Sequence, residues 1–135
     1  MLYTKDYDFS FSGLKTAVLY HHKAQPKNVQ KSKKYVRAMA KEIQQAIIDV
    51  LILKTLRAAK EYNAKSVVLG GGVGANKELR KQLRARFDIP LLVAAPSLCT
   101  DNAVMIGIAG YLNWKNGIIV KKPEDLKADP NLRIA

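Results

Sequence analysis

The sequence predicts an α/β fold in which parallel strands are packed against helices. Two strand-like apolar runs, at 66–69 and 91–95, alternate with helical patterns, and the first leads straight into a glycine-rich turn. Strands joined through a helix in this way pair in parallel. Because 48% of the 135 residues are hydrophobic, the chain can bury a core. We therefore expect one folded unit over 1–122 and a polar tail over 123–135.

The N-terminal half is expected to contain one strand and two helices. Polar and aromatic residues alternate at 8–12, which predicts a half-buried strand with both phenylalanines facing the core, followed by a short helix to about residue 20. Pro26 marks a loop. From 29 to about 62 the chain has no glycine or proline, which predicts a helical region, either continuous or interrupted. This helix is apolar on nearly all sides, as is typical of a central, packed helix.

The C-terminal half continues the alternation. After the strand at 66–69 and its glycine turn, Leu79, Leu83 and Phe87 form one stripe of an amphipathic helix. The strand at 91–95 is followed by a loop and an apolar helix from 103 to about 114. A sheet of about three strands has open edges that need covering. We therefore expect the unit to lie beside another lobe.

Positive charge is concentrated in two stretches. The formal net charge is +12, no acidic residue occurs between Phe9 and Lys41, and a second basic group lies at 77–86. Such clusters favour a polyanion, because binding neutralises phosphates and releases counterions. A solvated helix face is the alternative for each cluster. Two clusters in so short a chain favour RNA, with the proposed contacts at Lys31, Lys33, Lys34 and Arg37.

The glycine run at 70–74 carries the strongest local chemical signal. Four of its five positions are glycine, so the backbone can approach a ligand closely, and the next helix offers its positive end to an anion. A phosphate or a ribose suits such a loop. The run matches neither a Walker A motif nor a good dinucleotide fingerprint, and a tight turn without a ligand is the alternative. Asn76 can cap the following helix or bind a ribose hydroxyl or a base.

Asp101 precedes the apolar helix at 103–114 and has two interpretations. It can cap the helix N-terminus, which is the common role of such a residue, or it can hold a divalent metal ion beside the glycine loop. Cys99 is the only cysteine, which suits a structural role and a reducing cytoplasm. The longest apolar run is far shorter than the roughly 20 residues of a membrane span. We expect a cytoplasmic protein without membrane contact.

Three segments, at 8–16, 71–76 and 99–106, together resemble the signature segments of the tRNA N6-adenosine threonylcarbamoyltransferase (TsaD) family, in the right order and spacing. This family belongs to the actin-like ATPase superfamily. The resemblance implies that the chain is part of the C-terminal lobe of a two-lobed fold, with the N-terminal lobe absent. It also implies transfer of a threonylcarbamoyl group from threonylcarbamoyl-AMP to N6 of adenosine 37, in tRNAs that read ANN codons.

The resemblance assigns roles by position. Gly71, Gly72, Gly74 and Asn76 match the nucleotide-contacting loop, Asp101 matches a metal ligand, and Ser10, Ser12 and Gly13 lie in the active-site cleft. The implied cofactors are a divalent metal, iron or zinc, and a nucleotide, threonylcarbamoyl-AMP or ATP. The implied partners are tRNA and subunits similar to TsaB and TsaE.

One departure from the family pattern bears on activity. The other metal ligands of the family are two histidines spaced His-x-x-x-His, whereas the two histidines of this chain, His21 and His22, are adjacent. We therefore expect the chain alone to be inactive, and no general base can be named. Two other functions stay open at this stage, namely one lobe of a sugar or acetate kinase-like phosphotransferase and a non-enzymatic RNA-binding module.

Overall fold

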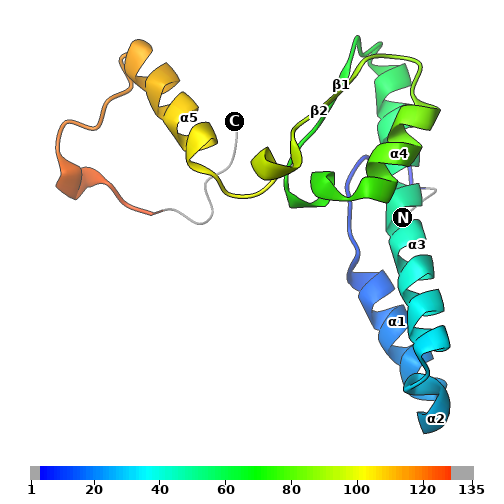
Figure 1. Ribbon diagram of the computed structural model, residues 1–135. Coiled ribbons are helices and arrows are strands. Elements are labelled where there is room, and N and C mark those ends of the chain that lie inside the picture. Colours follow the sequence, from blue (N-terminus) through cyan, green and yellow to red (C-terminus); the bar gives the residue numbers. More distant parts are fainter. Residues whose placement is uncertain (1–3, 129–135) are drawn as a thin grey trace.

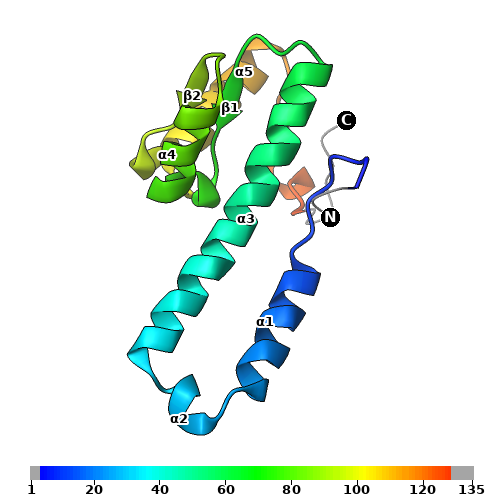
Figure 2. The same cartoon turned by 90° about the vertical axis from the view of Figure 1, so that its right-hand side faces the viewer.

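A computed structural model describes residues 4–128 and consists of a helical hairpin, a small α/β unit and an outlying C-terminal helix (Figure 1). The hairpin is made of α1 (Ser12–Ala24) and α3 (Lys33–Glu61), joined by the short α2 (Lys27–Gln30). Figure 2 shows α1 lying along the N-terminal half of α3, with α2 at the turn. The predicted helical region is confirmed in its interrupted form, because α2 ends at Gln30 and α3 begins at Lys33.

The α/β unit confirms the predicted parallel pairing. Strand β1 (Val67–Leu69) pairs with β2 (Leu91–Val93), and Val67 lies opposite Leu91. A 3₁₀ turn, η1 (Gly72–Ala75), and helix α4 (Lys77–Arg86) connect them. The connection carries the chain from the carboxyl end of β1 back to the end of the sheet where β1 began, so β2 runs parallel to β1. The sheet described within residues 4–128 has two strands, where about three were expected.

The missing strand is the one predicted at 8–12, and this prediction is wrong. The carbonyl oxygen of Asp8 accepts a hydrogen bond from Lys54 Nζ at 2.7 Å, and α1 already begins at Ser12. Phe9 is 48% exposed, so only Phe11 turns toward α3. The alternation of polar and aromatic residues therefore reflects local contacts with a helix and not the two faces of a sheet.

The core is small and lies between α3 and α4. It consists of Ile48 and Ile52 from α3 with Leu79 and Leu83 from α4, flanked by half-buried side chains that include those of Leu69, Phe87 and Leu91. The stripe predicted for α4 is thus confirmed. Helix α3 is central, but its packing is incomplete, because Leu53 is 41% exposed. The core fixes α4, and with it the glycine turn, against the middle of α3.

Helix α5 (Ala103–Lys115) extends away from this core (Figure 1) and is exposed throughout. It ends at Lys115, close to the predicted residue 114, with Asn116 as C-cap and Gly117 at φ 74°. The accessible surface of the chain is 11277 Å², against about 7,000 Å² for a compact monomer of this mass. Much apolar surface is therefore open. The exposed apolar side chains of α5 are Val104, Met105, Ile106, Ile108, Tyr111, Leu112 and Trp114.

The expected tail begins with a 3₁₀ turn, η3 (Pro123–Asp125). Its last part, residues 129–135, lies outside the described residues. In the part of the chain that the structure covers, no helix combines the length and apolar character needed to cross a membrane.

Candidate functional site

The glycine loop begins where β1 ends. Gly71 has φ 74° and ψ 170°, a backbone conformation that favours glycine. The turn then closes, because Gly74 N donates to Gly71 O at 2.9 Å and Asn76 N donates to Val73 O at 3.0 Å. The loop thus reverses the chain at the carboxyl end of the strand and delivers it to the N-terminus of α4.

Different structural features account for glycine at the four positions of the loop. The turn itself requires Gly71, and Gly74 is buried, where a β-carbon would lie 3.5 Å from Leu69 Cγ and 3.8 Å from Cys99 Sγ. A β-carbon on Gly70 or Gly72 would meet nothing within 4 Å. Neither a positive φ nor packing accounts for glycine at these two positions. Open space beside bare backbone is what close approach of a ligand requires.

Asn76 is the N-cap of α4, as one of its two interpretations predicted. Its Oδ1 accepts a hydrogen bond from Leu79 N at 3.0 Å, and its Nδ2 donates to Gln44 Oε1 on α3 at 3.0 Å. Both ends of the amide are engaged. Asn76 therefore caps α4 and also links its start to α3. These two contacts explain the presence of asparagine here without a ligand.

A cavity of about 700 Å³ lies between α3 and the glycine loop. Its walls include Ile43 and Ile47 from α3 and Gly72 from the loop, with the amides of Gln44 and Asn76 as polar groups. Small-molecule sites have volumes of roughly 300–1,000 Å³, apolar walls and a few polar groups. The cavity beside the loop meets this description.

Ser10, Ser12 and Gly13 lie at the start of α1 and are exposed. The hydroxyl oxygens of Ser10 and Ser12 are 3.4 Å apart. Ser12 lines a second cavity, of about 610 Å³, whose far wall again includes Ile43 and Ile47. The fold thus brings the start of α1 and the glycine loop, about sixty residues apart in sequence, to the same stretch of α3.

The interpretation of Asp101 as a helix cap is wrong. The N-cap of α5 is Asn102, whose Oδ1 accepts a hydrogen bond from Met105 N at 3.1 Å. Asp101 precedes the cap and is exposed. Among residues 4–128, no group of three His, Cys, Asp or Glu side chains is placed to hold a metal ion. These residues therefore do not form a complete metal site, and Asp101 offers a single carboxylate.

The proposed RNA contacts gather at one end of the hairpin. Lys31 is the C-cap of α2, while Lys33, Lys34 and Arg37 lie in the first turns of α3, and all four are exposed. Figure 2 shows α2 and the start of α3 at the turn of the hairpin. The nearby histidines pack instead on Tyr35, with ring centroids 6.4 Å (His21) and 5.8 Å (His22) from the tyrosine ring. The second basic stretch is less uniform than predicted, because the guanidinium of Arg80 points into the fold.

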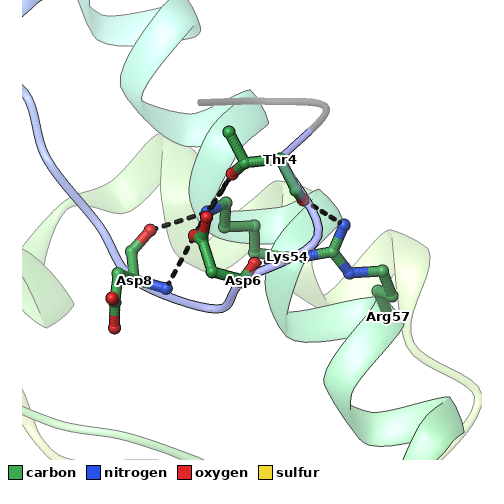
Figure 3. Close-up of polar contacts among 5 residues, drawn as sticks. All are labelled: Thr4, Asp6, Asp8, Lys54 and Arg57. Carbon is green, nitrogen blue, oxygen red and sulfur yellow. Dashed lines mark hydrogen bonds and ion pairs between the residues drawn. The ribbon is translucent and has the colours of Figure 1, made fainter.

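A polar cluster around Lys54 was not anticipated from the sequence (Figure 3). Lys54 is 1% exposed, and its Nζ donates to Asp6 Oδ1 and to the Asp8 carbonyl, each at 2.7 Å, and to Thr4 Oγ1 at 3.0 Å. The hydrogen bond from Lys54 is the main cause that lowers the pKa of Asp6 to about 2. Arg57 donates to the carbonyl of Thr4 at 2.7 Å. Together these contacts fix the chain just before Ser10.

A signal for this cluster is present in the sequence. Lys54 interrupts the apolar stretch of α3 and follows Val50 by four residues, so it falls on the same stripe as this apolar side chain. A lysine on a buried stripe needs partners, because an unpaired buried charge is costly. The structure provides such a partner in Asp6, but nothing in the spacing shows that the start of the chain returns to this helix.

The strand, glycine turn, helix N-terminus and adjoining cavity define an α/β protein with the loop architecture typical of nucleotide-binding sites. The model of one family, TsaD: tRNA N6-adenosine threonylcarbamoyltransferase, matches residues 1–108. The chain belongs to this family.

Named relatives agree with the family assignment. Two proteins called tRNA N6-adenosine threonylcarbamoyltransferase match most of the chain. The one from Thermosipho africanus is 44% identical over 99% of the chain, and the one from Shouchella clausii is 50% identical over 83% of it. A third, in Desulfotalea psychrophila, is 49% identical over 78% of the chain. The chain spans 40%, 34% and 32% of the length of these three relatives. Family membership favours the transferase over the kinase-like and non-enzymatic alternatives.

Proposed function

We propose that this chain supplies the glycine-loop part of an enzyme that transfers a threonylcarbamoyl group from threonylcarbamoyl-AMP to N6 of adenosine 37 in tRNAs reading ANN codons. Family membership supports the reaction. The observation in the structure that carries the proposal is the open space beside Gly72, which lines a cavity of about 700 Å³. In this proposal the chain forms part of the C-terminal lobe of an actin-like fold and is inactive alone.

The geometry suits the AMP part of the donor. The base and ribose would occupy the cavity, where Ile43 and Ile47 give apolar contact. The Nε2 group of Gln44 and the second N–H of Asn76 Nδ2, whose first bonds Gln44 Oε1, would give hydrogen-bonding partners. The phosphate would lie against the bare backbone at Gly71 and Gly72, near the positive end of α4. Binding in this orientation would leave the transferred group outside the loop, so this chain's contribution to the rate is positioning.

The remaining parts of the proposal concern a metal ion, the RNA and partner subunits. Asp101 would contribute one ligand to an iron or zinc ion, whose other ligands must come from outside the described residues. The basic end of the hairpin would contact phosphates of the tRNA, which gives affinity without base recognition. Subunits similar to TsaB and TsaE would assist, in the cytoplasm.

The test is nucleoside analysis by mass spectrometry of tRNA from cells depleted of the protein that contains this chain. Threonylcarbamoyladenosine should disappear and should return with the wild-type gene. Gly72→Val should fail to restore it, because the side chain fills the space that the phosphate needs. Lys65→Ala, at an exposed charged position just before β1, is the control and should restore it fully. Unchanged modification after depletion would refute the proposed activity.

A binding measurement separates the loop from the reaction. Calorimetry on the protein carrying Gly72→Val should show loss of nucleotide binding with cooperative unfolding retained, and Gly72→Ala should give an intermediate affinity. Because φ at residue 72 is not in the left-handed region, neither substitution strains the backbone. If Gly72→Val binds nucleotide as the wild type does, the loop is only a turn.

A further inference from the structure

The guanidinium of Arg80 joins three segments that are separate in the sequence. Its Nε donates a hydrogen bond to the carbonyl oxygen of Gly74 at 2.5 Å, within the glycine loop. Its Nη2 donates to the carbonyl of Ala94, just after β2, at 2.7 Å, and lies 3.1 Å from Cys99 Sγ. One side chain on α4 therefore contacts the loop, the end of the sheet and the turn that leads to Asp101.

We propose that Arg80 is a positioning residue that holds the glycine loop and the turn at Cys99–Asp101 at a fixed separation. The inference rests on the proposed function, because these two segments carry its candidate nucleotide and metal contacts. Asp101 follows Cys99 by only two residues, so fixing the cysteine limits where the carboxylate can lie. Direct packing supports the link, since the buried Gly74 lies against Cys99.

Arginine suits this position better than any other residue. Its planar guanidinium offers five N–H donors in a fixed fork, so one group can serve two carbonyls and a sulfur at once. Lysine has a single flexible ammonium and cannot reproduce the fork. Removing the guanidinium would leave the carbonyls of Gly74 and Ala94 without this donor. The loop and the turn would then be free to move apart.

The rest of α4 provides a matched control. Arg84 lies one helical turn after Arg80, carries the same group and is exposed. Arg84→Met therefore removes the same charge from the same helix, and we expect it to leave the loop and the turn as they are. Arg80→Met keeps most of the length of the side chain and removes only the fork.

The first measurement is made on this chain and does not depend on catalysis. Cys99 is the only cysteine and is 3% exposed, so its reaction with a thiol reagent reports opening of the turn. Because the carbonyls of Gly74 and Ala94 lose a buried donor, we expect Arg80→Met to speed this reaction about tenfold or more, and Arg84→Met to leave it unchanged. Hydrogen exchange should rise together at Gly72–Ala75 and at 98–101, while the amides of Ile48 and Ile52 keep their protection.

Unchanged reactivity and exchange in Arg80→Met would overturn the proposal. An equal rise at every amide would also overturn it, since that is the result of general destabilisation. The absence of transfer activity in the parent protein would refute the proposed function and leave these readouts unaffected, so the two failures are distinguishable.

The second measurement uses the longer enzyme that contains these residues. A displacement of about 1 Å at a reacting centre costs on the order of 100-fold in rate. Arg80→Met should therefore lower kcat for transfer by about that factor while nucleotide affinity changes only a few-fold, and Arg80→Lys should fall between. Full transfer activity in Arg80→Met would refute positioning by Arg80, even if the exchange result had shown the two segments to be linked.

Discussion

The cluster around Lys54 allows a prediction of stability to be worked from the structure. In Lys54→Met the buried stem is kept, so no cavity forms, but the three hydrogen bonds from Nζ to Thr4, Asp6 and Asp8 are lost. Breaking a fully buried ion pair costs about 3–5 kcal/mol. Here the Asp6 side chain is 52% exposed and regains water. We therefore expect a smaller loss, about 2 kcal/mol, or roughly 6–8 °C in Tm.

The pH dependence isolates the part of this loss that comes from the ion pair between Lys54 and Asp6. The pKa of Asp6 is lowered from 3.8 to about 2, so its ion pair stabilises the fold fully above pH 3.8 and is lost as the pH falls through about 2. The difference in stability between wild type and Lys54→Met should therefore shrink over this interval. Thermal unfolding followed by circular dichroism between pH 5 and pH 2 measures it.

An exposed lysine on the same helix provides the control. Lys41→Met should change stability by no more than about 0.5 kcal/mol at any pH in this range. A Tm of Lys54→Met equal to that of the wild type at pH 5, or a difference that does not change down to pH 2, would refute the assignment of the loss to this ion pair.

The other predictions concern RNA, the candidate metal ligand and α5. Binding of tRNA, measured by filter binding, should weaken steeply between about 50 and 200 mM salt. Replacing Lys31, Lys33, Lys34 and Arg37 together by alanine should make this dependence on salt flatter. An unchanged slope would exclude these four residues from the RNA contact. Asp101→Asn in the full-length enzyme should lower metal content and cut transfer by orders of magnitude, with Tm nearly unchanged because Asn102 is the cap; full metal content and activity would contradict the ligand role. The single Trp114, 63% exposed, should be quenched readily by acrylamide in this chain, whereas protection would mean that α5 is covered.

Local patterns determined the elements on which the candidate site is built. The stripe of Leu79 and Leu83 predicted α4 and its buried face, because apolar spacing of three and four residues places side chains on one side of a helix. The glycine run predicted a turn between a strand and this helix, and the ordered motifs indicated the family. These features depend on neighbours in sequence, so the sequence alone contains them.

The tertiary structure decided which group each polar side chain meets. The segment at 8–12 has strand-like alternation, yet Lys54, more than forty residues away, binds its backbone and no strand forms. Arg80 belongs to a basic stretch, but its guanidinium points into the fold, because it donates hydrogen bonds to the carbonyls of Gly74 and Ala94. Asp101 and Asn102 are both good caps by type, and the geometry of the turn selects Asn102.

The same division holds for the glycines. Four glycines in five positions predict a turn. Only the path of the chain decides which glycine needs a positive φ, which one is buried and which ones face open space. Gly71 meets the first condition, Gly74 the second, and Gly70 and Gly72 the third. The sequence therefore determined the kinds of element and the family, while contacts between distant segments, set by packing on α3, decided the role of each residue.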